Sequence, residues 1–447
     1  MATAYNTLIP ALKKRLPEDM LDILGRAVAF VRRLREIRAS LFVWCVVLSR
    51  FAQGRPGFEE ARRWYERLGG SRLWPRPFQM RFKVASAVAL FERAFAQAVA
   101  PWQDARQRRP RHPLAKKFPD IVAIDSTAAQ VFDVLRRHFK GTRSAKAAIK
   151  ILLTISLYGL LPLAGQIVPG NVHDMLLFPS LTLFRAGTLL LFDKGFVAYE
   201  RLQEIADASL LYLCPMRQNG NPIVVGVRRA PAWVRKALRR HPEGVRLRSL
   251  LPRTKSLSQP WDLDVRVIPK TQSLRTAKRS WIYTRLVILP GPKGTQHPYL
   301  TNLAPVEWDP QAMRELYRLR WQVELVFKEL KQHLNLEHLP TKDRHAVQIF
   351  AWASLIALAV SRTVSRWIEP VVGAVGLAAK ARPMLVTRAL VATIRLLGRA
   401  LVLPARRALL LLRLLAEEIL AEIAAIDTGR EDSFRRLLPL LSDGRRC

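Results

Sequence analysis

The sequence predicts a mixed α/β chain, more closely α+β, in which helical regions at both ends flank a strand-rich centre. Three observations support this fold class. Apolar residues recur at helical spacing within residues 1–105, short apolar and β-branched runs fill residues 120–192, and helical spacing returns from Pro310. At 447 residues the chain is long enough for about two to four domains.

The N-terminal region, residues 1–105, is predicted to be a helical region that binds DNA. A helix over Phe58–Leu68 ends at Gly69 and Gly70, which suits a glycine C-cap. Residues 1–120 contain 24 Lys and Arg against 10 Asp and Glu, so these helices present a basic surface that suits phosphate contacts. The alternative is a solvated basic bundle that makes no DNA contact.

A strand-rich core is predicted after a basic, proline-containing linker at residues 106–119. In residues 120–209, the first part of this core, two apolar runs lead into an aspartate, Asp125 and Asp193. Residues 210–303 contain further short strand-like pieces separated by glycine, proline and asparagine turns, which predicts a β-rich subdomain.

Helices return after the β-rich stretch. Residues 304–345 contain a helix with an apolar stripe. Residues 346–447 are mostly helical, and the run at 408–415 is apolar around most of its circumference, so we expect it to be buried. Burial within the same subunit and burial between two subunits are both open, which makes this a possible dimerisation region.

The net charge indicates the kind of partner. With 73 Lys and Arg against 35 Asp and Glu the formal net charge is +38, which favours a polyanion, and nucleic acid more than an anionic membrane surface. The most apolar stretches, residues 149–163 and 346–361, are shorter than the roughly 20 residues of a spanning helix, so no membrane association is expected. Cys45, Cys214 and Cys447 are few and widely separated, which fits a reducing compartment.

Three carboxylates stand out because of where they lie. Asp125 and Asp193 follow apolar strands, and Glu324 lies on a strongly basic helix. Carboxylates from separate elements suit a hard cation such as Mg²⁺, and two such ions can activate a nucleophile and stabilise the leaving oxygen of an in-line displacement. Taken singly, each acid has an ordinary alternative: a turn residue for either aspartate and an ion-pair partner for Glu324.

The helix around Glu324 carries a more specific pattern. Tyr317, Arg320, Glu324 and Lys331 follow one another at offsets of three, four and seven residues, which places all four on one helix face. A carboxylate surrounded by a guanidinium, an ammonium and a phenol suits a metal ligand that lies among phosphate contacts.

At these residues the sequence resembles the DDE transposases of bacterial insertion sequences, of the insertion-sequence-four type with the YREK signature. The segments Ile-Asp-Ser-Thr at 124–127 and Asp-Lys-Gly-Phe at 193–196 match the two aspartate motifs of that family. The stretch at 170–174 resembles the segment that precedes the second aspartate, and the motifs together cover residues 120–345.

The resemblance implies a ribonuclease-H-like catalytic core with a β-rich insertion. The catalytic residues and metal ligands that it implies are Asp125, Asp193 and Glu324, holding Mg²⁺ or, in its place, Mn²⁺. The DNA contacts that it implies are Tyr317, Arg320 and Lys331. The implied partners are double-stranded DNA, as transposon ends and as target, and a second copy of the chain in the DNA complex. The implied location is the bacterial cytoplasm, at the nucleoid.

The predicted function is that of a transposase that binds terminal inverted repeats, cleaves them by metal-assisted phosphodiester hydrolysis and transfers the 3′ ends into target DNA. Two alternatives are a ribonuclease-H-like nuclease or resolvase without strand transfer, which has no need of the YREK helix, and an inactive DNA-binding remnant. Related enzymes stack a tryptophan of the insertion on a flipped base. Trp281 and Tyr299 are the candidates for that role here, and each can equally belong to the core.

Overall fold

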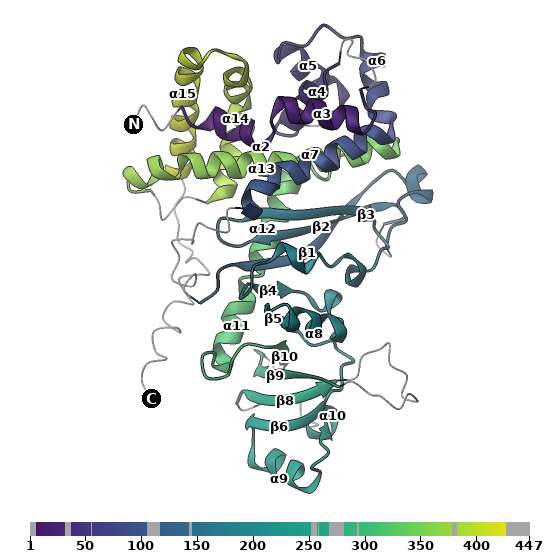
Figure 1. The fold of residues 1–447 in the computed structure, drawn as a ribbon, viewed down its shortest axis with the longest axis vertical. Coiled ribbons are helices and arrows are strands. Elements are labelled where there is room, and N and C mark those ends of the chain that lie inside the picture. The colour runs from purple at the N-terminus through teal and green to yellow at the C-terminus, as the bar shows by residue number, and fades with distance from the viewer. Residues whose placement is uncertain are drawn as a thin grey trace.

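The helices from both ends of the chain gather at one end of an elongated molecule, and a single sheet extends from them to the other end (Figure 1). The structure is a computed structural model. It describes residues 6–31, 37–54, 56–104, 117–142, 145–251, 257, 259–267, 281–292, 295–377 and 382–425.

Ten strands form the sheet, in the order β3-β2-β1-β4-β5-β10-β9-β8-β6-β7. Strand β4 is parallel to both β1 and β5, and the other pairs are antiparallel. The strands are β1 (Ile121–Gln130), β2 (Ala148–Ser156), β3 (Leu161–Pro169), β4 (Leu189–Phe192), β5 (Leu211–Pro215), β6 (Ile223–Arg229), β7 (Val245–Arg246), β8 (Trp261–Val267), β9 (Ile282–Pro290) and β10 (Gln296–Thr301).

The strand-rich stretch at 210–303 does not form a sheet of its own. Its first strand, β5, pairs with β4 of the core, and its last, β10, pairs with the other edge of β5. The remaining strands then continue the sheet outward through β9, β8 and β6. The boundary expected at residue 210 is therefore not a boundary between two sheets. Strand β10 pairs with the edge of β5 that β4 leaves free, so the sheet continues across it. The described helices between the strands are α8 (Tyr199–Asp207), α9 (Ala232–Arg240) and α10 (Leu247–Leu250).

Helix α13 (Arg344–Ala374) lies between the N-terminal helices and the sheet. It contacts α2, α4 and α7 on one side and β3 on another. It is long and apolar enough to cross a membrane, but 94% of its most apolar window is buried inside the protein, as in a core helix. The N-terminal helices are α2 (Leu8–Arg15), α3 (Glu18–Ala27), α4 (Ala39–Ser49), α5 (Phe58–Arg67), α6 (Pro75–Met80) and α7 (Ala85–Asp104).

The linker expected at 106–119 lies mostly outside the described residues, but the regions that it joins share one core. Buried side chains of α4 and α7 belong to the same hydrophobic cluster as those of α13 and of strands β1 to β3. The rings of Phe58 and Phe82 each pack against Phe350 of α13. The N-terminal region is therefore packed against the core through α13, and its helices depend on α13 for burial.

The last two described helices, α14 (Pro383–Val402) and α15 (Ala405–Ala424), pack against each other. The run at 408–415, which we expect to be buried within the subunit or between two subunits, is buried only in part by the described residues of one chain. Leu412 and Leu415 are buried, but Leu410 is 62% exposed and Leu414 is 41% exposed. Two leucines on one face of α15 are thus left uncovered by the part of the chain that the structure describes.

A buried ion pair fixes helix α12 (Trp321–Gln332), which carries Glu324, against the C-terminal helices. Arg362 of α13 makes two hydrogen bonds of 2.7 Å to the carboxylate of Glu329, and both side chains are fully buried. Thr387 of α14 donates to the same carboxylate, and Arg362 also donates to the carbonyl oxygen of Leu160. A buried pair with its remaining donors satisfied tolerates the loss of neither partner.

We expect Arg362→Met to lower the free energy of unfolding by about 3–5 kcal/mol, because it leaves the Glu329 carboxylate buried and unpaired. Glu329→Leu should cost a similar amount for the converse reason. The double variant should cost clearly less than either single variant, since no uncompensated charge is then left in the core. Urea unfolding of the three variants measures this, and strictly additive losses would contradict it.

Candidate active site

The register of β1 against β4 brings two of the predicted carboxylates together. Ile124 pairs with Phe192 at the end of the parallel ladder, and Asp125 and Asp193 each come one residue later. Neighbouring parallel strands run in the same direction, so these two positions lie side by side. Asp125 is not at the end of its strand, because β1 continues to Gln130 in antiparallel pairing with β2. Strand β4, in contrast, ends at Phe192.

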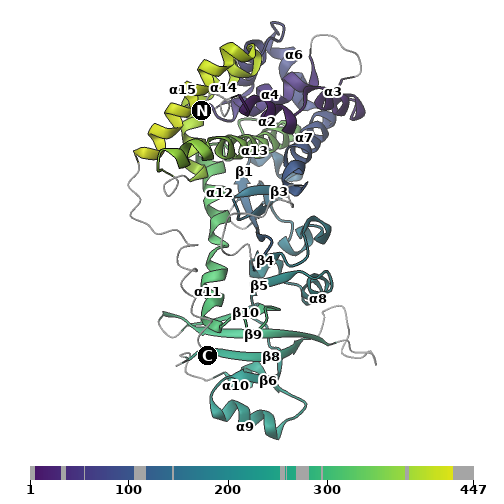
Figure 2. The same ribbon diagram turned by 60° about the vertical axis from the view of Figure 1, so that its left-hand side comes forward.

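The third carboxylate, Glu324, reaches the same place from a helix. Helices α11 (Pro310–Arg318) and α12 follow each other along one side of the sheet (Figure 2). Helix α11 contacts β5 and β9, and α12 contacts β1. Glu324 is in the first turn of α12, where the positive end of the helix dipole favours a carboxylate.

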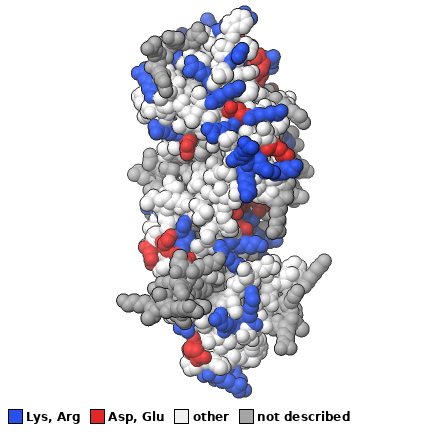
Figure 3. Space-filling view, turned by 90° about the vertical axis from the view of Figure 1, so that its right-hand side faces the viewer, with Lys and Arg blue, Asp and Glu red and all other residues white. Residues whose placement is uncertain are grey.

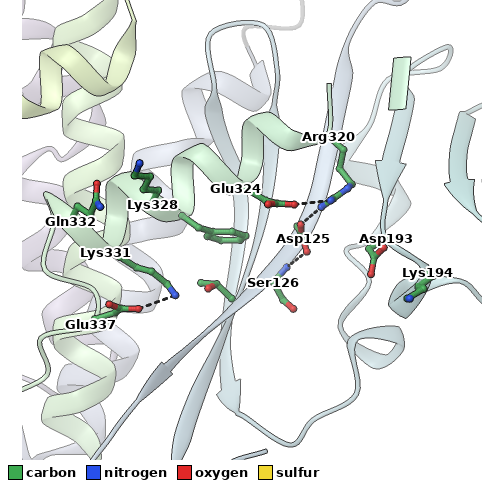
Figure 4. Close-up of a pocket in the computed structure, with 12 residues that line it drawn as sticks. Asp125, Ser126, Asp193, Lys194, Arg320, Glu324, Lys328, Lys331, Gln332 and Glu337 are labelled. Atoms are coloured by element: carbon green, nitrogen blue, oxygen red, sulfur yellow. Dashed lines mark hydrogen bonds and ion pairs between the residues drawn. The ribbon is translucent and has the colours of Figure 1, made fainter. Parts of the chain in front are cut away.

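Arg320 stands between two of the acids. One terminal nitrogen of its guanidinium contacts the Asp125 carboxylate, and the other donates to Glu324 at 2.7 Å. The Nε of Arg320 is buried and has no hydrogen-bond partner among the described residues, so the side chain keeps a donor for another acceptor. Figure 4 shows this bridge, with Asp193 and Lys194 across from it.

The three carboxylates line one cavity of about 700 Å³. Cations surround it as well, so the cavity combines acidic and basic groups in the way expected of a site for a metal ion and a phosphodiester. Its lining residues are Asp125, Ser126, Thr127, Asp193, Lys194, Arg320, Glu324, Phe327, Lys328, Lys331, Gln332 and Glu337.

Burial controls the ionisation of Asp125. Loss of water around the carboxyl raises its pKa to about 6, although the Arg320 guanidinium and the backbone N–H of Ser126 favour the charged form. The nearby charges of Asp193 and Glu324 add to the rise. A carboxyl with this pKa gains strongly from any cation placed between it and its acidic neighbours.

A second polar cluster lies behind the two aspartates. Asp174, at the start of the short helix η5 (Asp174–Leu177), accepts hydrogen bonds of 2.9 Å from Ser126 and from Lys150 of β2. Lys150 also donates to the carbonyl oxygen of Val172. A Cβ at Gly195, two residues after Asp193, would lie 3.1 Å from the Asp174 carboxylate. Asp174 therefore ties the residue after Asp125 to β2 and leaves little space for a side chain at Gly195, two residues after Asp193.

The signature residues do not all share the arrangement expected from one helix face. The helix is interrupted at Leu319 and Arg320, where backbone bonds span three residues instead of four, so Tyr317 belongs to α11. Tyr317 is not among the residues that line the cavity. Its ring packs against Tyr299 and lies beneath the Arg320 guanidinium. Lys331 does line the cavity, where it makes a 2.9 Å ion pair with Glu337.

Sequence reasoning assigned no role to several residues of the site. Gln332 follows Glu324 by eight residues, so helical spacing from Glu324 could have identified it; Lys328, four residues after Glu324, was expected only as a possible ion-pair partner of Glu324 and instead lines the cavity. Trp321 is 57% exposed beside Arg320, and its position off the apolar stripe of the helix was the available signal. The aromatic candidates from the sequence are covered: Tyr299 is buried, and Arg266 stacks on Trp281. Glu337 comes from a loop and gives no local signal.

Comparison with known proteins decides the family. Residues 116–360, more than half of the chain, match the family described as "Transposase DDE domain". The chain belongs to the DDE transposases. All three carboxylates and the whole cavity lie within the matched residues.

Two relatives of this transposase are transposases of insertion sequence elements. The transposase of insertion sequence element IS231F from Bacillus thuringiensis subsp. israelensis is 24% identical over 377 residues, 78% of each chain. That of IS231E from B. thuringiensis subsp. finitimus is 23% identical, over 78% of this chain and 77% of that one. The piggyBac transposase in a synaptic complex with hairpin DNA is 11% identical with a TM-score of 0.45, over 98% of this chain and 85% of that one. A TM-score below 0.5 does not establish a shared fold.

The donor set of the transposase fits a hard divalent cation. Two aspartates and a glutamate from three elements line one cavity, and oxygen ligands of this kind suit Mg²⁺ and Mn²⁺. Within the described ranges, however, no three Asp, Glu, His or Cys side chains are close enough to enclose a metal ion. The Arg320 guanidinium lies between Asp125 and Glu324 and pairs with both carboxylates.

The raised pKa of Asp125 predicts a pH-dependent stability in metal-free buffer. Its ordinary pKa is about 4, so between about pH 4 and 6 the folded protein keeps a proton that the unfolded chain has released. Stability is therefore lost as pH rises through this window, by at most roughly 1.4 kcal/mol per pH unit.

Asp125→Asn removes this loss. Relative to the wild type, the variant should gain stability from pH 4 to 6 and stay level from pH 6 to 8. Chemical unfolding in EDTA at several pH values measures the difference in the free energy of unfolding between variant and wild type. Titrating groups that the two proteins share cancel in this difference. A constant difference across pH 4–8 would show that Asp125 titrates normally.

Proposed function

We propose that this transposase cuts DNA at the ends of its own element and joins the freed 3′ ends to target DNA. The observation that carries this proposal is the cavity in which Asp125, Asp193 and Glu324 meet among lysines and an arginine. The order β3-β2-β1-β4-β5, with antiparallel β2 and β3 and parallel β4 and β5, supports a ribonuclease-H-like core as the scaffold.

The three carboxylates would hold Mg²⁺, or Mn²⁺ in its place. A metal bound there would supply a lower pKa for the attacking water or 3′-hydroxyl and charge stabilisation for the leaving oxygen. The residues of the chain orient the DNA for this step. Lys194, Lys328 and Lys331 surround the carboxylates and offer donors to phosphate oxygens on both sides of the scissile bond.

Arg320 changes partners when DNA binds. In the free protein it neutralises Asp125 and Glu324. A phosphate offers the same guanidinium a bidentate acceptor, which frees both carboxylates to face a cation. Tyr317 supports the guanidinium from beneath and reaches the DNA only through it. The exposed ring of Trp321, next in the chain, presents a face on which a displaced base can stack.

The N-terminal helices contribute to binding of the terminal repeat. Deleting residues 1–110 would not test this cleanly, because the same helices cover α13 and their removal would expose its apolar surface. Substitutions of exposed cations leave this core intact and are the informative experiment.

The uncovered face of α15 supports a dimer in the DNA complex. Leu410 and Leu414 are exposed on α15, and Val402 is exposed at the end of α14. A chain with a net charge of +38 repels its copy until DNA neutralises both, so the dimer forms on paired ends.

Asp125→Ala should abolish cleavage and strand transfer of a duplex that ends in the terminal repeat, while binding of that duplex stays nearly unchanged. The assay uses the full chain with Mg²⁺ or Mn²⁺ and scores nicked, double-cut and joined products. Cleavage without any joined product from the wild type would favour a nuclease or resolvase. An Asp125→Ala protein that still cleaves would refute the proposed site.

Arg320→Ala should lower the rate of cleavage by on the order of 100-fold or more, because a phosphate contact that acts in the transition state is lost. The matched control is Arg318→Ala. Arg318 pairs with Glu315 on the neighbouring turn at 2.7 Å and is exposed, so its loss should cost only about 0.3–0.5 kcal/mol of stability and little activity. Equal rates of cleavage for the two variants would show that Arg320 is only an ion-pair partner of the two carboxylates.

Leu410→Glu should prevent pairing of two protein–DNA complexes without unfolding the chain. Multi-angle light scattering with and without the repeat duplex should show two chains per complex for the wild type and one for the variant. Leu412→Glu is not a suitable substitute, because Leu412 is buried within the subunit. A wild-type complex with one chain that still performs strand transfer would exclude the dimer.

A further inference from the structure

Three segments far apart in the sequence meet where the N-terminal helices adjoin the sheet. They are η1 (Arg81–Lys83), the segment Phe132–Lys140 that contains η4 (Asp133–Arg137), and Lys342–His345 at the start of α13. His345 Nδ1 lies 3.0 Å from the Lys83 carbonyl oxygen, and Arg344 lies 3.4 Å from His138. The ammonium of Lys342 lies 5.9 Å from the Phe132 ring. We call these three segments the junction surface.

The junction surface is strongly basic. Its exposed cations are Arg81, Lys83, Arg136, Arg137, Lys140, Lys342 and Arg344. Among its residues that the structure describes, two are acidic. Asp343 caps α13 by accepting from the backbone N–H groups of His345 and Ala346, and Asp133 lies 3.8 Å from Lys146. Figure 3 shows Lys and Arg side chains gathered on this side of the molecule near the level at which the helical end meets the sheet. The surface therefore requires an anionic partner.

Apolar side chains stand among these cations. Phe132 is 45% exposed and Val134 is 66% exposed, and they flank Asp133 at the turn that leaves β1. Exposed apolar groups beside arginines match the two faces of a nucleic acid, its phosphates and its sugars and bases. A small anion would use the cations and leave Phe132 and Val134 without a role.

The junction surface is continuous with the candidate active site through two chain segments. Strand β1 carries Asp125 in the cavity and reaches Phe132 two residues after its end at Gln130. The loop after α12 places Glu337 in the cavity and, five residues later, Lys342 beside Phe132. These two connections place the junction surface next to the cavity along both β1 and the loop after α12.

We propose that the junction surface binds the double-stranded DNA that runs on from the strand held in the active site. Arg136, Arg137 and Lys83 contact its phosphates, and Phe132 and Val134 pack against the sugar edge of a groove. The inference rests on the proposed function, because it needs DNA in the cavity. It adds that one DNA duplex contacts both the N-terminal region and the strand β1, and that η4 makes the central contacts with it.

The test compares two arginine pairs in the full-length protein. Arg136→Ala with Arg137→Ala removes two cations from the last turn of η4. The control, Arg239→Ala with Arg240→Ala, removes two exposed cations from the last turn of α9, at the far end of the molecule (Figure 1). Both pairs change the net charge equally, and neither pair is buried.

The measurement is the salt dependence of binding to a 40-base-pair duplex that carries the terminal repeat. Each lost phosphate contact reduces the slope of log K against log salt by about 0.9, so the η4 pair should reduce it by about 1.8 and the α9 pair by nearly zero. A photo-crosslinking amino acid at Val134 should label the duplex. Equal slopes for the two pairs, or crosslinking that is absent at Val134, would overturn the inference.

Two further arms separate the possible failures. A scrambled duplex of the same length tests repeat preference: if the wild type shows none, the proposed function fails, while the slopes of the two pairs on this duplex still decide the junction surface. Vesicles containing phosphatidylserine test the other polyanion. Loss of vesicle binding in the η4 pair with unchanged DNA slopes would assign the surface to a membrane and refute the inference.

Discussion

The site depends on the parallel pairing of β1 with β4. Because Ile124 is opposite Phe192 and β4 ends there, the chain must place Asp125 and Asp193 side by side at the point where the two strands separate. A shift of one residue in this register would turn the Asp125 side chain to the other face of the sheet. The bonds from Asp174 to Ser126 and Lys150 oppose such a shift, since they join β1, β2 and η5 directly behind the pair.

Helix α12 needs a separate anchor, because it is far from β1 and β4 in the sequence and packs against β1 without belonging to the sheet. The buried Arg362–Glu329 pair supplies it and connects α12 to the two helices that follow. Glu329 lies five residues after Glu324, so any rotation of α12 that moved the Glu324 carboxylate would also pull Glu329 away from Arg362. Burying a full ion pair costs desolvation free energy. In return, the pair holds α12 in one fixed orientation.

The sequence could predict the three carboxylates because their residue types and settings are local properties. Each aspartate follows an apolar run, and Glu324 is an acid on a basic helix. The interruption at Leu319 and Arg320 carries no glycine or proline signal, so the single helix face that was expected for Tyr317 and Lys331 could not be corrected from the sequence. The pairing of β10 with β5, such as Leu300 with Cys214, and the contact of Arg320 with Asp125 join residues that are far apart in the sequence, 195 positions in the second case. Local periodicity contains no information about such distant partners.

Charge balance explains why so basic a chain keeps acids at its centre. Asp125 is largely buried beside two other carboxylates, and its raised pKa is the sign of that cost. Arg320 compensates for two of these acids, but an arginine has no open coordination position and cannot activate a water or hydroxyl as a metal ion does. Under the proposed function, a metal ion facing the carboxylates and a DNA phosphate facing the guanidinium would together replace this contact. Each charge would then exchange one partner for another, so that no buried charge would be left uncompensated.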